Sequence, residues 1–267
     1  MKQANDFLEE YLDLHALVEP LSADALEQTT GFKSWTIETV IRHLTFWNRM
    51  ALWALAEPER LVTALEPLMA GMRAGKSLPQ LEGDSITLSG RALVSAWHTS
   101  CEETAHAYQH ADPSTRCAWV GPSMSARSCI TARQMETWAH GQAIYDCLGR
   151  DRVNTDRLHT IVVLGVNTYE WTFKVRGQEA PAPKPSLALT APSGEAWTFG
   201  DPQPDNCVSG SAEAFAQVVT QTRHVSDTSL VVTGEPATLW MASAQCFAGG
   251  AATPPAPGTR RKAALGA

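Results

Sequence analysis

Apolar residues in the first 150 positions recur every three or four residues, which is the spacing of amphipathic helices. Ser34 or Thr36 can cap the start of the second predicted helix, and Gly149 ends the fourth. Four long helices that each present one apolar face are typical of a four-helix bundle. The pattern places these helices at about 3–20, 34–55, 88–110 and 128–148.

Residues 57–87 lie between the second and third predicted helices and contain three prolines and several glycines. Pro and Gly both weaken a helix when they occur in its interior. The composition therefore predicts a long connection that includes some helix. With this connection inside it, the predicted bundle occupies residues 1–154.

The hydrophobic pattern changes after the bundle, where short alternating or β-rich runs bounded by turn residues begin to appear. The β-rich runs are 169–175, 186–190 and 196–199, and runs with helical spacing follow at 212–222 and 236–247. This mixture predicts a small α+β domain at 155–250. Residues 251–267 are rich in Gly, Ala and Pro and are predicted to be a disordered tail.

The chain has 267 residues and a net charge of -7. This acidic balance argues against nucleic acid or an anionic membrane as partner, because both attract basic surfaces. No apolar run approaches the roughly 20 residues that span a bilayer. The first residues lack the apolar core of a signal peptide, so we expect a cytoplasmic protein. Six cysteines without a Cys-x-x-Cys pair favour reduced thiols over disulfides or a zinc knuckle.

A candidate metal site comes from two of the predicted bundle helices. Glu136 and His140 lie four positions apart, so their side chains leave the same helix face. His43 points inward from the second helix, and the three could converge in the bundle core. Two imidazoles and a carboxylate suit Zn²⁺, and also Fe²⁺, Ni²⁺ or Mn²⁺, and leave a position open for water or substrate. The alternative is a hydrogen-bonded core histidine beside a solvated Glu-x-x-x-His pair.

Other polar residues allow two interpretations each. Arg223 and His224 follow a predicted helix of the second domain, where the arginine could bind a substrate carboxylate or form a surface ion pair. Arg127 precedes a helix N-terminus, which suits an anion or is a simple helix-start loop. The nine tryptophans indicate an aromatic-walled pocket or a bulky core. The five remaining histidines are predicted to be structural.

Several motifs resemble those of a known family. Trp35-Thr36-Ile37, followed by Val40 and His43-Leu44, resembles the first signature of the DinB-like metal-binding four-helix bundles. Residues 121–128 and 135–142 resemble the branch of that family related to mycothiol-dependent maleylpyruvate isomerase. Runs similar to the small C-terminal domain of this branch are 164–166, 175–177, 189–192, 218–225 and 232–234. The likeness covers about residues 5–250.

The resemblance implies that His43, Glu136 and His140 hold a divalent metal ion, usually zinc. It also implies that a low-molecular-weight thiol, mycothiol in actinobacteria, is the cosubstrate. An arginine of the C-terminal domain acts near the site in this family, and Arg223 is the position that matches it. Many relatives carry an acidic residue where this chain has Asn48. If that carboxylate supports a metal ligand or acts as a base, its role is either weakened here or filled by an amide.

The function implied by this resemblance is a metal-dependent mycothiol S-transferase acting on a small-molecule electrophile. A free thiol with a pKa of about 8.5 is mostly protonated at pH 7, and coordination to a divalent cation deprotonates it. One particular case is exchange of ergothioneine for mycothiol on a lincosamide sugar intermediate in antibiotic biosynthesis. The residues expected to bind substrate are Trp47, Arg127, Trp138 and His224, with Arg223 as the catalytic residue.

Two other functions stay open. The same site could catalyse cis/trans isomerisation of a maleylpyruvate-like diacid by reversible thiol addition, or the protein could bind a thiol or metal without catalysis. The expected partners are a small-molecule thiol and a small-molecule electrophile, with a homodimer as an open alternative.

Overall fold

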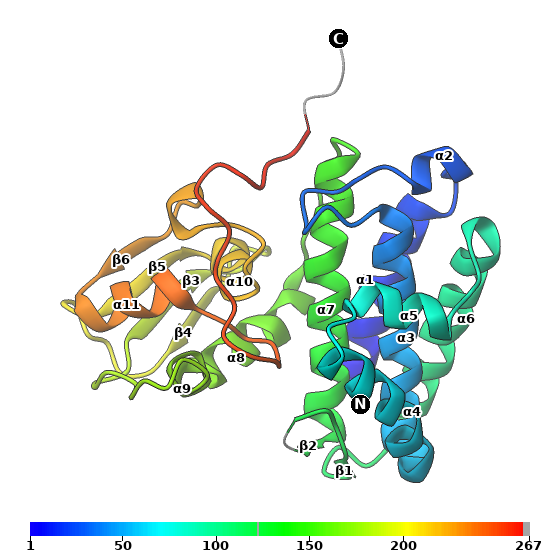
Figure 1. Cartoon of the computed structure of the whole chain (residues 1–267). Helices are drawn as coiled ribbons and strands as arrows, with labels where there is room; N and C mark the ends of the chain where they lie inside the picture. Colours follow the sequence, from blue (N-terminus) through cyan, green and yellow to red (C-terminus); the bar gives the residue numbers. More distant parts are fainter. Residues whose placement is uncertain (122, 264–267) are drawn as a thin grey trace. The chain divides into compact units, whose positions relative to one another are not determined.

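Four long helices form the framework of the first of two structural units, Met1–Cys147 (Figure 1). The computed structural model describes residues 1–121 and 123–263. The helices are α1 (Lys2–Val18), α3 (Ile37–Ala56), α6 (Gly90–His110) and α7 (Ala126–Cys147). Each of α1 and α3 packs against both α6 and α7, which closes the bundle that the sequence predicts. None of the helices in the described part of the chain is both long and apolar enough to cross a membrane.

The faces that these helices bury follow the predicted periodicity. In α1 the buried residues Phe7, Tyr11 and Leu14 recur every three or four positions, and such a stripe is the face that a bundle covers. At the start of α3, the hydroxyl of Thr36 accepts a hydrogen bond from the backbone N–H of Thr39 at 3.1 Å. Thr36 is therefore the N-cap of the helix that carries His43.

The segment 57–87, expected to be mainly a connection, consists largely of two helices. They are α4 (Pro58–Arg73) and α5 (Leu78–Ser85), after a short α2 (Ala23–Leu26) earlier in the chain. Pro58 and Pro79 occupy the first turns of α4 and α5, where a missing N–H costs little. Ser77 and Gln80 form a capping box at the start of α5. These prolines therefore mark helix starts rather than loops.

The second unit, Leu148–Ala267, is built on a four-stranded sheet with the order β4-β3-β5-β6. The strands are β3 (Ser186–Thr190), β4 (Ala196–Phe199), β5 (Cys207–Ser211) and β6 (Val231–Thr233). Strand β3 pairs parallel with β5, and the other pairs are antiparallel. The helices are α8 (His159–Asn167), α9 (Tyr169–Lys174), α10 (Ala212–Val219) and α11 (Glu235–Ser243). Helix α10 packs on β3 and β5, as an α+β domain requires.

One run of the second unit was predicted wrongly. Residues 169–175 are β-rich in composition, but Tyr169–Lys174 forms α9. The buried residues of this run are Tyr169, Thr172 and Phe173, which recur at three and four positions and so fit one face of a helix. The β3 and β4 strands coincide with predicted runs, whereas β5, β6 and α8 lie outside them.

The C-terminal tail differs from the expected disordered segment in its described part, 251–263. Arg176 donates a hydrogen bond from Nη2 to the carbonyl of Ala252 at 2.6 Å. The backbone N–H of Gly258 donates to Oδ2 of Asp227 at 2.7 Å, and Arg260 donates to the carbonyl of Gln221 at 2.7 Å. The composition predicted disorder, but hydrogen bonds with the folded unit fix the position of this segment. Residues 264–267 of the predicted tail lie outside the described residues.

Candidate metal centre

Adjacent helices α3 and α7 bring together the three residues predicted to hold a metal. One nitrogen each of His43 and His140 and one carboxylate oxygen of Glu136 all lie within 4.8 Å of one another. The Nε2 atom of His140 lies 3.1 Å from Oε2 of Glu136, and Nε2 of His43 lies 3.8 Å from the same oxygen. The helical spacing of Glu136 and His140 and the inward face of His43 produce this cluster.

These spacings fit a divalent ion between the three donors. Two ligands about 2.0–2.1 Å from zinc at a tetrahedral angle lie roughly 3.3 Å apart, between the two distances seen here. The side chains of His43 and His140 are 8% and 10% exposed, whereas that of Glu136 is 26% exposed. A ligand can therefore reach the cluster beside Glu136. Three protein donors leave at least one position of a tetrahedral ion for a molecule other than the protein.

Burial and mutual contacts shift the protonation of the three groups. Burial raises the pKa of Glu136, but hydrogen bonds with His140 and His43 outweigh it and hold the pKa far below the ordinary carboxyl range. Burial lowers the pKa of His43, but hydrogen bonds with Glu136 and Glu82 leave it above the ordinary imidazole value. For His140 burial prevails, and its pKa is lowered. The site thus keeps Glu136 ionised and His140 neutral, the forms that bind metal.

Sequence reasoning missed Glu82, which lies in α5 inside the supposed connection. Its Oε1 atom accepts a hydrogen bond from Nδ1 of His43 at 2.8 Å and another from Nε1 of Trp47 at 2.9 Å. Glu82 is completely buried. The available signal was the helix start Ser77-Leu78-Pro79-Gln80, which would have placed Leu81 and Glu82 within a packed helix.

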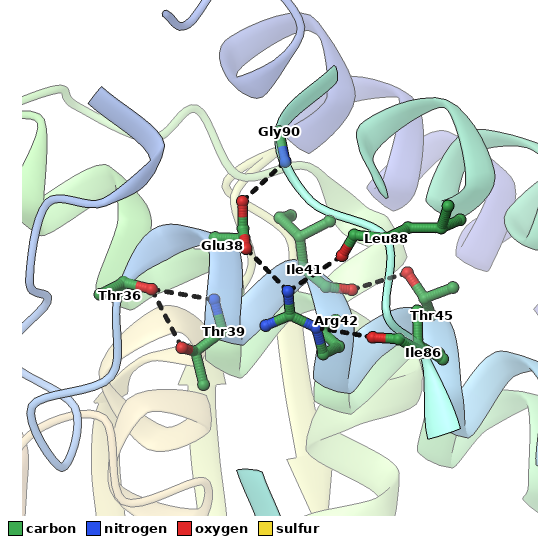
Figure 2. Close-up of polar contacts among 9 residues, drawn as sticks. All are labelled: Thr36, Glu38, Thr39, Ile41, Arg42, Thr45, Ile86, Leu88 and Gly90. Atoms are coloured by element: carbon green, nitrogen blue, oxygen red, sulfur yellow. Dashed lines mark hydrogen bonds and ion pairs between the residues drawn. The ribbon is translucent and has the colours of Figure 1, made fainter. Parts of the chain in front are cut away.

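A polar cluster on α3 fixes the chain just beyond α5 (Figure 2). The guanidinium of Arg42 donates from Nε to the carbonyl of Ile86 at 3.1 Å and from Nη2 to the carbonyl of Leu88 at 3.0 Å. Glu38 accepts from Arg42 at 2.7 Å and from the backbone N–H of Gly90 at 2.7 Å. The end of α5 is therefore tied to the same helix that carries His43.

Aromatic rings from the loop before α3 pack on the two histidines of the cluster. The ring of Trp35 stacks parallel to that of His140, with centroids 5.8 Å apart, and Phe32 meets His140 edge-on at 4.9 Å. Between these two aromatic residues, Lys33 and Ser34 adopt left-handed backbone conformations with φ of 49° and 57°. Such conformations are uncommon for residues with a Cβ and occur where the surroundings fix them.

The residues predicted to bind substrate have different positions. Trp47 lies near His43, with ring centroids 6.2 Å apart, and also packs against Trp119 at 5.5 Å. Trp138 is completely buried in the chain. Arg127 is exposed at the start of α7. Contact with substrate stays a prediction for all three residues, although Trp47 lies next to His43 of the candidate metal site.

Arg223 and His224 belong to the second unit, directly after α10. The guanidinium of Arg223 donates to the carbonyl of Thr222 at 2.9 Å. The ring of His224 accepts from the backbone N–H of Ser226 at 3.1 Å and caps a short 3₁₀ turn. Both side chains therefore form hydrogen bonds with neighbouring residues of the chain. Their roles in catalysis and substrate binding stay predictions.

Asn48 lies in a buried polar network with Arg133. Its Oδ1 atom accepts a hydrogen bond from Nε of Arg133 at 3.0 Å, and its Nδ2 donates to Sγ of Cys101 at 3.1 Å. Arg133 is 2% exposed, and burial lowers the pKa of its guanidinium. The amide therefore supplies the acceptor that a buried arginine needs.

The bundle and its His-Glu-His cluster together define a DinB-like helical protein. The family described as the mycothiol maleylpyruvate isomerase N-terminal domain matches residues 7–145. The chain belongs to this family.

Two relatives share 36% identity with the chain over 240 residues, which cover 89% of this chain and 91% of each relative. They are the uncharacterized proteins Rv0036c and MT0041 of Mycobacterium tuberculosis strains ATCC 25618 / H37Rv and CDC 1551 / Oshkosh. The crystal structure of the mycothiol-dependent maleylpyruvate isomerase has a TM-score of 0.50 and 16% identity, over 81% of this chain and 85% of that one. It shares the fold of this protein.

Proposed function

We propose that this protein is a metal-dependent enzyme that transfers mycothiol, or a similar low-molecular-weight thiol, to a small-molecule electrophile. The observation that carries the proposal is the open triad of His43, Glu136 and His140, with donor atoms within 4.8 Å. Membership of a family named for a mycothiol-using enzyme supports the choice of thiol. We take zinc as the metal, because two imidazoles and a carboxylate suit it and leave a coordination position open.

A divalent ion held by the triad would supply a positive centre that favours the thiolate form of a bound thiol. The residues of the chain would prepare and shield this centre. Glu136 supplies a carboxylate whose low pKa keeps it ionised, and His140 is kept neutral. The rings of Phe32 and Trp35 cover one side of His140 and limit its access to water. Arg223 is proposed to bind an anionic group of a substrate.

A second candidate reaction uses the same site for cis/trans isomerisation of a maleylpyruvate-like diacid. The names of the matching family and of the structural neighbour favour this candidate. Exchange of ergothioneine for mycothiol on a lincosamide sugar is a particular case of the transferase reaction. Binding of thiol or metal without catalysis is a third possibility.

Product analysis distinguishes these functions. Zinc-loaded protein would be incubated with mycothiol and panels of thioether, halide and unsaturated diacid electrophiles. A transferase forms a C–S bond, releases the leaving group and consumes one thiol per product. An isomerase forms and then breaks that bond, so the free thiol returns unchanged. Binding of mycothiol by calorimetry without either product would contradict both reactions.

A further inference from the structure

We infer that Glu82 is a positioning residue that fixes His43 for metal binding through Nε2. The inference rests on the proposed metal centre and assigns a role to a residue outside the triad. Oε1 of Glu82 lies 2.8 Å from Nδ1 of His43, and a carboxylate oxygen only accepts. The proton of a neutral His43 ring is therefore held on Nδ1, which leaves the lone pair of Nε2 directed to the side of Glu136.

The burial of Glu82 gives independent support for this role. The residue is completely buried, and its second oxygen, Oε2, has no hydrogen-bond partner among the described residues. A half-satisfied buried carboxylate destabilises a fold relative to an apolar side chain of similar size. Its presence directly behind a metal-binding imidazole is thus explained by function, since carboxylate partners orient such rings and increase their basicity.

Contacts before and after Glu82 in the chain fix the position of this residue. Before it, the capping box of Ser77 and Gln80 sets the start of α5. After it, Arg42 of α3 binds the carbonyls of Ile86 and Leu88 (Figure 2). Helix α5 therefore presents its carboxylate to α3 in a fixed register.

The same oxygen also binds Trp47, so Glu82 connects the metal ligand to an aromatic side chain beside it. A loss of metal affinity on substitution of Glu82 could therefore arise through His43 or through Trp47, and the variant Trp47→Phe distinguishes the two. If Glu82 acts on His43 directly, removing the indole N–H in Trp47→Phe leaves the contact with His43 in place. If Glu82 merely holds Trp47, then Trp47→Phe reproduces the effect of losing Glu82.

The test is the zinc affinity of Glu82→Gln, measured by competition with a chromophoric chelator. This substitution keeps an acceptor oxygen for His43 but removes the negative charge of the carboxylate. We expect affinity to fall by about 10- to 100-fold, the usual effect of losing an outer-shell partner. Asp84→Asn is the matched control because it removes an exposed carboxylate from the same helix. Both Asp84→Asn and Trp47→Phe should stay within about threefold of the parent protein.

A spectroscopic measurement excludes a merely structural effect. In zinc-loaded protein, ¹⁵N NMR should show a His43 ring protonated at Nδ1 and coordinated through Nε2, with a slowly exchanging Nδ1 proton. In Glu82→Gln that proton should exchange faster. Unchanged affinity in Glu82→Gln, equal loss in Trp47→Phe, or coordination through Nδ1 would each overturn the inference. Absence of zinc binding by the parent protein would instead contradict the proposed function.

Discussion

Nε2 of His43 on α3 lies 3.8 Å from Oε2 of Glu136 on α7, although the two residues are far apart in the sequence. The same carboxylate oxygen lies 3.1 Å from Nε2 of His140. Glu136 thus faces both imidazoles, and its Oε2 atom is within hydrogen-bonding distance of His140. Protons and a divalent ion would compete for these nitrogen and oxygen atoms.

Replacing Glu136 by Gln should weaken zinc retention more than the Glu82 substitution does. The substitution removes an anionic donor but preserves the shape of the side chain, so the bundle should stay folded. We expect a loss of more than about 100-fold in zinc affinity, because a direct ligand contributes more than an outer partner. Competition with a chelator gives the affinity, and circular dichroism checks the fold. A change in thermal stability alone would show that Glu136 is structural.

Zinc binding should strengthen as the pH rises from 6 to 8. Burial lowers the pKa of His43, but its interactions with the carboxylates of Glu136 and Glu82, which accept from the ring, raise the pKa above the ordinary imidazole value. Protons therefore compete with the ion below the folded pKa. The increase in Tm produced by stoichiometric zinc should therefore be smaller at pH 6 than at pH 8. Equal increases at both pH values would contradict the prediction.

The metal-free protein should show the opposite pH trend at His43. A folded-state pKa above the unfolded value contributes stability that is fully present below the unfolded pKa. This contribution is lost as the pH rises through the folded pKa. The difference in unfolding free energy between the metal-free parent and metal-free His43→Gln should thus decrease from pH 6 to pH 8. This difference is measured by urea denaturation in the presence of a chelator.

Asn48 should be important for stability because it binds the buried guanidinium of Arg133. We expect Asn48→Leu to reduce the free energy of unfolding by about 3 kcal/mol, since it leaves a buried charge without that acceptor. Adding Arg133→Met should recover part of this loss, because the charge itself is then removed. Urea denaturation of the two single variants and the double variant gives the coupling. Additive effects would show that the contact contributes no stability.

Much of the bundle could be predicted because helical periodicity is strong in its four long helices. The triad was accessible because Glu136 and His140 share a helix face and His43 lies on a buried one. The role of Glu82 could not be predicted, because the sequence alone does not show whether a proline begins a helix or interrupts one. The prolines of residues 57–87 therefore hid the helix that carries Glu82. Likewise, Tyr169 and Phe173 have β-forming side chains, and only their packing on one helical face decides the structure.

Metal analysis of purified protein tests the account most directly, using the parent chain, His43→Ala and His140→Ala. His106→Ala is the control, because this histidine is exposed on α6. After loading with zinc and gel filtration, the parent and the control should each retain about one ion per chain. The two triad variants should retain less than about a tenth of that amount, since each loses one of three protein donors. Unchanged zinc content in both triad variants would contradict the metal centre proposed for this protein.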